Sequence, residues 1–244
     1  MDLFKKSLFW GSALLLLSAC TDYVAQMEEG FGAWDIPCRT ATGGAVVCGE
    51  LQDARDGQKY MTVTIGSQTW MAQNLNYATE HSACYDDDTK ICSSYGRLYT
   101  WAAAMGSTEF ACGRGYYCVF PEKSQGVCPD GWHMPDSTEW EELIRTVGGA
   151  SVAGKMLKST KNWPSAGNGS DDYGFSALPA GTSSGMASQY EENKYDKKGS
   201  YTGFWSSMQQ GGSVGSGLVL NSSNRASVEG VAKNAGLSVR CVKD

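Results

Sequence analysis

The sequence predicts an α+β fold with an antiparallel sheet, two or three helices and long disulfide-stapled loops. Three observations lead to this prediction. Strand-like segments gather at both ends of the stretch after residue 50, and helix-like segments lie between them. The 244 residues include 30 Gly and 19% are charged, which is typical of a loop-rich globule rather than a helical bundle. Eight of the nine cysteines follow Cys20, and an even set in an exported chain indicates disulfides.

Residues 1–20 are typical of a lipoprotein signal peptide. Lys5 and Lys6 supply positive charge, and residues 8–17 form an apolar stretch that is too short to span a bilayer as a mature helix. Small residues then precede Cys20, as in a bacterial lipobox, so cleavage would leave this cysteine to carry lipid such as palmitate. We expect a lipoprotein anchored to the outer membrane, at the cell surface. An ordinary signal peptide with a chance cysteine is the alternative.

Composition divides the rest of the chain into three parts. Residues 21–33 are acidic and lack periodicity, which indicates a tether. Residues 34–50 hold two cysteines around a Thr-Gly-Gly turn, so we expect a Cys-stapled hairpin that extends the main domain. The main domain is expected over residues 51–244.

The eight remaining cysteines fall into three close pairs and one distant pair. Eight cysteines allow 105 pairings, and the spacing favours this one. Structural zinc is the rival interpretation, but the chain has no Cys-x-x-Cys and only two His. The expected disulfides are Cys38–Cys48, Cys84–Cys92, Cys112–Cys118 and Cys128–Cys241.

Alternation of apolar and polar residues predicts the strands. Residues 60–65 alternate, and Gly66 and Ser67 turn the chain into a second strand over 68–75, so the two segments predict a β-hairpin. The distant cysteine pair would bring the last strand back to the middle of the chain, and we expect the terminal strands to lie side by side. Further strands are expected over residues 202–208, 216–220, 225–231 and 237–242, with a short one over 175–178.

The clearest helix follows Pro135. Asp136 can cap it with Glu139 three positions later, a capping box, and Thr138 with Glu141 is the alternative frame. Gly148 and Gly149 end the helix. Its apolar face comprises Trp140, Leu143, Ile144 and Val147.

Two shorter helices are expected, one beginning near Thr100 and one over residues 151–158. The segments between these elements are polar or rich in Gly and are expected to be loops. They are residues 76–94, 106–129, 162–174 and 183–200.

Six ordered segments of the chain resemble one family: DARDGQKYMTVTIGSQTWMAQNLNY, YGRLYTW, QGVCPDGWHMPDSTEWEEL, DDYGFSALPAG, FWSS and SVRCVKD. They resemble the Fibrobacter succinogenes major paralogous domain, which occurs in many exported and lipid-anchored bacterial proteins. The resemblance covers residues 51–244. The helix start and the closing SVRCV are also similar to the formylglycine-generating-enzyme branch of the C-type-lectin-like fold. The resemblance therefore implies a C-type-lectin-like α+β domain, without implying an activity.

The expected chemistry is not catalytic. Formylglycine generation would need a reactive cysteine pair near the end of the chain, whereas only Cys241 is there and Cys128 is its expected partner. His133 lies between Trp132 and Met134, which favours a packed, hydrogen-bonded side chain over a base or a ligand. An enzyme of the formylglycine-generating or oxidase type is the alternative, and a purely structural envelope protein is a third interpretation.

Two acidic clusters are weak calcium candidates, because hard oxygen ligands on turns suit this ion. One is the triplet 86–88, and the other comprises Asn168, Asp171 and Asp172. Neither has EF-hand spacing, so solvated acidic loops are the simpler interpretation, and we expect no cofactor.

Aromatic residues in polar or Gly-rich loops indicate a recognition surface. Exposed rings stack on the C–H faces of sugars, although loop aromatics also cap cores. A net charge of −6 without a basic run excludes nucleic acid as an expected partner. We expect a non-catalytic surface lipoprotein that binds extracellular polysaccharide or a surface protein, and the membrane through its lipid. The candidate contact residues are Tyr116, Tyr117, Trp163 and Tyr190.

Overall fold

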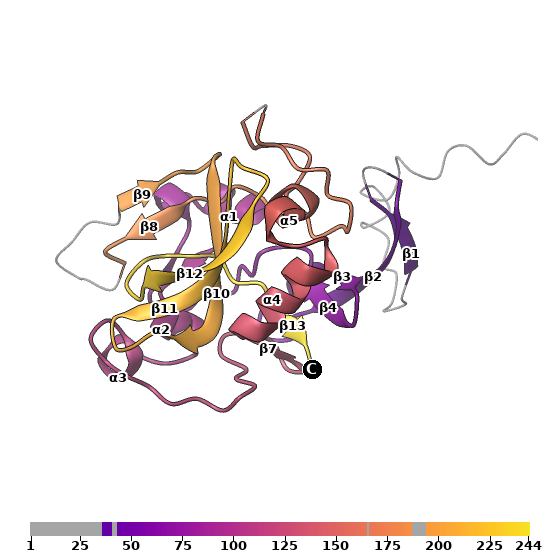
Figure 1. Ribbon diagram of the computed structural model, residues 1–244. Helices are drawn as coiled ribbons and strands as arrows, with labels where there is room; N and C mark the ends of the chain where they lie inside the picture. The colour runs from indigo at the N-terminus through magenta and orange to yellow at the C-terminus, as the bar shows by residue number, and fades with distance from the viewer. Residues whose placement is uncertain (1–35, 41–42, 165, 187–193) are drawn as a thin grey trace, which may run out of the picture. The chain divides into compact units, whose positions relative to one another are not determined.

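The computed structural model describes residues 36–40, 43–164, 166–186 and 194–244 (Figure 1). Side chains of residues 36–39 and 45 lie outside this description. The signal peptide, Cys20, the tether and Tyr190 also lie outside the described residues, so the predictions about them are not addressed by the structure.

The largest sheet has six strands in the order β1-β2-β3-β4-β13-β7. Its strands pair antiparallel throughout. The last described strand, β13, is an internal strand of the sheet, because Val242 pairs with Trp70 on one side and with His133 on the other. This confirms that the terminal strands lie side by side. The strands are β1 (Ile36–Arg39), β2 (Ala45–Gln52), β3 (Lys59–Ile65), β4 (Gln68–Met71), β7 (Trp132–His133) and β13 (Val242–Lys243).

A second sheet of three antiparallel strands forms from β10 (Tyr201–Gln209), β11 (Val214–Asn221) and β12 (Ala226–Ala232). The sequence predicts these strands, but it predicts a single antiparallel sheet for the whole domain. The prediction of a single sheet is wrong. The register of β10 shifts between Trp205 and Gln209, and the chain that follows β12 pairs with the β10 backbone at an isolated bridge between Phe204 and Ser238. Two strand pairs complete the described β-structure: β5 (Ser82–Ala83) with β6 (Leu98–Tyr99), and β8 (Thr182–Ser184) with β9 (Lys194–Asp196).

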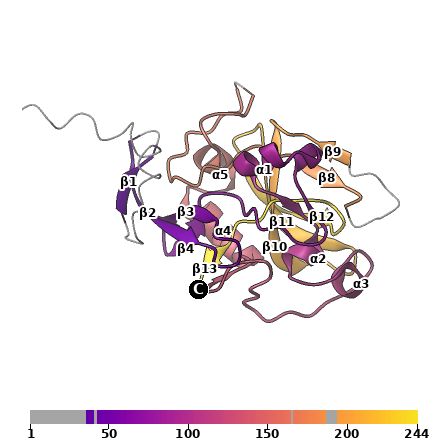
Figure 2. The same ribbon diagram turned by 180° about the vertical axis from the view of Figure 1, so that it is seen from behind.

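The helices are α1 (Thr89–Tyr95), α2 (Trp101–Ala104), α3 (Glu109–Cys112), α4 (Ser137–Thr146) and α5 (Ala150–Leu157), with a short 3-10 turn, η2 (Tyr85–Asp87). Figure 1 shows α4 and α5 on the near side, and Figure 2 brings α1 to the front, so these helices lie on opposite sides of the described unit. The overall α+β class with antiparallel sheets is therefore confirmed.

Helix α4 begins where the sequence places it. The Asp136 side chain accepts a hydrogen bond from the backbone N–H of Glu139, and the Glu139 carboxylate accepts one from the Asp136 N–H, which completes the capping box. Trp140 stacks on Trp70 of β4 with ring centroids 4.5 Å apart, and Phe204 of β10 lies 6.0 Å from the Trp140 ring. The apolar face of α4 thus joins the core between the two sheets. All four residues of the predicted face are buried.

Three predicted disulfides are present: Cys84–Cys92, Cys112–Cys118 and Cys128–Cys241. Cys48 is also disulfide-bonded. Its expected partner, Cys38, has a side chain outside the described residues. Strands β1 and β2 pair around Thr40 and Gly44, in agreement with the predicted hairpin.

Several predicted loops contain secondary structure. Helix α1 overlaps the range 76–94, α3 lies within 106–129, and the β8–β9 pair overlaps 183–200. In the reverse direction, the expected strand over 175–178 is only a single parallel bridge from Ala177 to Lys158. Helices of four to seven residues do not hold by themselves, so tertiary contacts and disulfides decide where they form.

Arg240 is a fully buried cation behind β13. Its guanidinium donates to Asn74 Oδ1 at 2.9 Å and to the Ser176 backbone oxygen at 3.1 Å. It also donates to the backbone oxygen of Phe175 and lies 4.4 Å from the centroid of that ring. Burial lowers the pKa of Arg240 to about 9. The Arg240 side chain therefore fixes the closing segment to residues 175–176, because breaking these hydrogen bonds would leave buried donors without a partner.

Candidate recognition surface

His133 has both ring nitrogens engaged. Nδ1 lies 2.6 Å from Asp244 Oδ1, and Nε2 lies 2.9 Å from Glu139 Oε1. Burial acts to lower the pKa of His133, but the hydrogen bonds and charges of Glu139 and Asp244 outweigh it and raise the pKa above its usual value. With only 3% of its surface exposed, His133 is packed and hydrogen-bonded, as the sequence predicts, and it joins the sheet to the first turn of α4.

Trp163 is buried, so the prediction that its ring meets a ligand is wrong. Only 5% of its surface is exposed, and its indole N–H donates to the Ala177 backbone oxygen at 2.9 Å. The Lys158 ammonium lies 4.9 Å from the ring centroid and donates to the backbone oxygens of Asn221 and Ser223. Trp163 therefore closes the core beneath a loop.

The Asn168–Asp172 cluster serves its own loop. Asp171 is buried and accepts hydrogen bonds from the Ser176 N–H at 2.7 Å and from the Ser176 hydroxyl. Burial raises the pKa of Asp171. Asn168 Oδ1 accepts from the Trp163 N–H at 3.2 Å. In the described part of the chain, no three His, Cys, Asp or Glu side chains are grouped to hold a metal. The side-chain oxygens of Asn168 and Asp171 thus accept hydrogen bonds within their own loop region.

The acidic triplet 86–88 is also engaged. Asp88 caps α1 by accepting from the Lys90 N–H at 2.9 Å, and Asp87 accepts from the Tyr195 hydroxyl at 2.6 Å. These bonds join α1 to β9 and give two of the three carboxylates a local structural role.

Tyr116 and Tyr117, in contrast, are exposed by 48% and 70%. They lie in the stapled loop, which we define as residues 109–119, closed by the Cys112–Cys118 disulfide. The same loop exposes Phe110 by 88% and Val119 by 89%. Among the described residues, only Val47 and Met208 are comparable large apolar side chains that face solvent. Such a concentration on one short segment is typical of an interaction site.

The backbone of the stapled loop is fixed from below. Lys233 is fully buried and donates to the Tyr116 backbone oxygen and to Gln209 Oε1, each at 2.7 Å. Its ammonium lies 4.2 Å from the Trp101 ring centroid. Gly115 donates to the Gly212 backbone oxygen at 2.8 Å. Through these contacts the β10–β11 hairpin and the chain after β12 hold the loop rigid while its apolar side chains face outward.

The two cysteines of the stapled loop belong to the core, unlike their neighbours. Cys112 and Cys118 are buried in the cluster around Trp101, and Phe120 packs edge-on against Trp101 at 5.8 Å. Burial lowers the pKa of Lys233, and the charge of Glu109 acts against this. The sequence predicts the tyrosines but misses Phe110 and Val119. The available signal is their place at the two ends of a short Cys–Cys loop, with Phe110 two residues before Cys112 and Val119 directly after Cys118.

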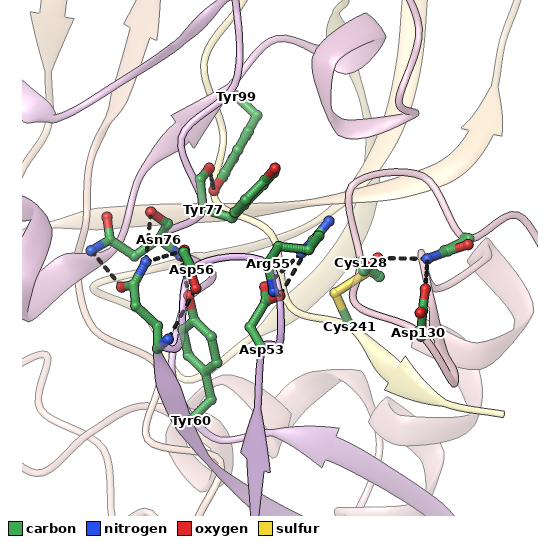
Figure 3. A network of polar contacts seen from close by, with 12 residues as sticks. Asp53, Arg55, Asp56, Tyr60, Asn76, Tyr77, Tyr99, Cys128, Asp130 and Cys241 are labelled. Carbon is green, nitrogen blue, oxygen red and sulfur yellow. Dashed lines mark hydrogen bonds and ion pairs between the residues drawn. A yellow bond between two sulfur atoms is a disulfide. The ribbon is translucent and has the colours of Figure 1, made fainter.

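A polar network surrounds the turn that precedes β3 (Figure 3). Arg55 forms a two-pronged contact with the buried Asp53, at 2.9 and 2.7 Å, and its guanidinium lies 3.9 Å from the Tyr77 ring centroid. Burial raises the pKa of Tyr60 to about 12, and the Tyr60 hydroxyl accepts from the Asn76 N–H at 3.1 Å.

Beside this network lies a polar hollow of 80 Å³. Side chains that carry amides and hydroxyls dominate its wall. The wall comprises Gln58, Lys59, Tyr60, Gln73, Asn74, Asn76, Cys92, Ser93, Ser94 and Gly96.

The fold and this surface define a class: a disulfide-stapled α+β domain that presents an apolar loop from a rigid sheet. A family model described as the Fibrobacter succinogenes major domain matches residues 63–243. The chain therefore belongs to this family, and the match lies within the predicted range 51–244. No curated protein and no solved structure matches the chain. No helix within the described residues is long and apolar enough to cross a membrane.

Proposed function

We propose that this chain is a non-catalytic, lipid-anchored recognition protein of the cell surface, whose stapled loop binds extracellular polysaccharide. The observation that carries the proposal is the outward display of Phe110, Tyr116, Tyr117 and Val119 on a backbone held from below. The lipobox ending at Cys20 supports the anchor. The closing SVRCV segment ends at Val242, which lies in β13 between β4 and β7, and this placement supports a C-type-lectin-like arrangement as the finer description of the fold.

Polysaccharide suits the chemistry of this surface. Aromatic rings offer flat apolar faces to the C–H faces of sugar rings, and tyrosine adds a hydroxyl that can bond to the sugar. A disulfide-closed loop has already lost the conformational freedom that binding would otherwise remove, so little ordering cost remains. The rings protrude beside exposed Arg114 and Gly115, which suits the surface of a long polymer.

A catalytic role is less well supported. Cys241 forms a disulfide with Cys128, and both are fully buried, so this pair does not supply the reactive thiol that formylglycine chemistry requires. His133 is held on both sides by carboxylates and is buried. These contacts support a structural role for the residues that first suggest chemistry.

The test is retention of the mature chain on insoluble cellulose, xylan and chitin. We expect retention on at least one polymer, and Tyr117→Ala should weaken it about fivefold, since an aromatic contact contributes about 1 kcal/mol. Val119→Ala on the loop and Val47→Ala on β2 form a matched pair, because both valines are exposed. Only the loop variant should lose retention. Lack of retention on all three polymers would leave a surface protein as the ligand and refute the polysaccharide proposal.

A further inference from the structure

We propose that the Cys84–Cys92 disulfide is a thiol-exchange site, at which an external thiol attacks Cys92 and Cys84 leaves. The inference rests on two observations: a cation that faces both sulfurs, and a hollow that reaches only one of the two cysteines. It is independent of polysaccharide binding and adds a chemical activity to a disulfide that otherwise looks purely structural.

Arg97 is the cation. Its Nη1 lies 3.6 Å from Cys84 Sγ and 4.0 Å from Cys92 Sγ. The guanidinium is oriented by Ser82 of β5, because Nε donates to the Ser82 hydroxyl at 3.0 Å and Nη2 donates to the Ser82 backbone oxygen at 3.1 Å. A fixed positive charge beside a sulfur stabilises the thiolate that forms when the disulfide opens, and a stabilised thiolate leaves faster.

The polar hollow decides which sulfur is attacked. Cys92, Ser93, Ser94 and Gly96 belong to its wall, and Cys84 does not. A thiol that enters among these hydroxyls and amides therefore reaches residue Cys92, of whose surface 4% is exposed, and not Cys84. Cys84, the nearer sulfur to Arg97, is then the leaving group.

The exchange is balanced with thiols alone. An external thiolate attacks Cys92 Sγ, a new sulfur–sulfur bond forms, and the electron pair of the old bond passes to Cys84 Sγ as a thiolate beside Arg97. A second external thiolate then attacks the sulfur of the first external thiol in the mixed disulfide, and Cys92 leaves as a thiolate. Two thiols thus become one disulfide, and the protein disulfide gains the two electrons. An external disulfide drives the reverse sequence.

The other two described disulfides lack this arrangement. Cys128 and Cys241 are both 0% exposed. The hydrogen bond at the Cys112–Cys118 pair is a donation from Cys118 Sγ to the Ala111 backbone oxygen. Within the described residues, no Arg or Lys side chain hydrogen-bonds to a sulfur of either pair. Cys112–Cys118 therefore serves as the internal reference for exchange without a guiding cation.

Opening this disulfide would release α1. The helix has seven residues and is held by the disulfide, by the Asp88 cap and by Asp87, which accepts from Tyr195 of β9. A helix of this length does not persist in water by itself, so exchange would also loosen the contact between β9 and η2, the turn that precedes α1.

The experiment follows the reduction of each disulfide in the folded mature chain by glutathione. Free thiols are trapped by alkylation at timed points and located by peptide mass mapping. We expect Arg97→Gln to slow opening of Cys84–Cys92 by roughly tenfold and to leave the Cys112–Cys118 rate unchanged. Arg97→Lys, which keeps the charge, should retain most of the rate. An Arg97→Gln rate equal to or above that of the wild type overturns the proposal.

A second pair of variants tests the route of attack. Ser94→Trp fills the hollow from α1, whereas Thr89→Trp adds the same bulk to an exposed position of that helix outside the wall. Ser94→Trp should slow reduction by glutathione several-fold, and Thr89→Trp should not. If both variants react at the wild-type rate, the thiol does not enter through the hollow and the assignment of Cys92 as the attacked sulfur is wrong.

Discussion

The Cys128–Cys241 and Cys112–Cys118 disulfides have different roles. Cys128–Cys241 joins residues 113 positions apart, is wholly buried and brings the last strand beside the entry to α4. Cys112–Cys118 joins residues six positions apart and is buried, whereas its neighbours in the stapled loop face solvent. The first fixes the topology and the second presents a surface. The comparison shows that the function of a disulfide follows from what its loop carries, and not from its burial.

The largest effect should come from removing the long bridge. Replacing Cys128 and Cys241 by Ala should lower the free energy of unfolding by about 4–5 kcal/mol, because the unfolded chain regains the freedom of a long loop. Replacing Cys112 and Cys118 by Ala should cost only about 2 kcal/mol, since that loop is short. Urea unfolding of the two double variants measures both values. Equal losses would contradict the separation of scaffold from surface.

The pH dependence of stability should arise at His133 of β7. His133 has a raised pKa in the folded protein, so its contribution is fully present below its unfolded pKa of about 6.5 and is lost as the pH rises through the folded value. Unfolding free energies measured between pH 5 and 9, a range of about four units around that pKa, should decline accordingly. His133→Gln should flatten the decline, and Asp244→Asn should reduce it. A decline that persists unchanged in His133→Gln would assign it to another group.

The smallest effect on stability is expected in the stapled loop. Phe110→Ser and Val119→Ser should each change the free energy of unfolding by less than about 0.5 kcal/mol, because these side chains are 88% and 89% exposed. The same variants should weaken retention on polysaccharide. A loss of stability near 2 kcal/mol would mean that these side chains pack within the protein and do not form a free surface.

Local patterns made much of the scaffold predictable. The capping box of Asp136 and Glu139 and the apolar face that begins with Trp140 depend on residues within two or three turns of each other. The close cysteine pairs are local for the same reason. Pairing of Cys128 with Cys241 then follows by elimination, and it correctly brings the last strand into the sheet.

Contacts between distant segments made the rest unpredictable. Trp163 lies in a polar stretch that looks exposed, but Lys158 and Ala177 cover its ring. Helix α1 has no apolar periodicity and depends on a disulfide and on β9. Phe110 and Val119 reverse the usual rule that apolar residues lie inside, so the proposed recognition surface is the part that sequence patterns predict least well.

The position of β13 between β4 and β7 also affects when the sheet can form during synthesis. Strands β4 and β7 have no direct pairing, and each meets residues 242–243 instead. During synthesis, β4 and β7 therefore wait with open edges until those late residues have emerged. The described sheet and the Cys128–Cys241 bond can therefore be completed only after residues 241–243 have emerged. A chain stopped before β13 would display two unpaired strand edges, which makes it recognisable to quality control.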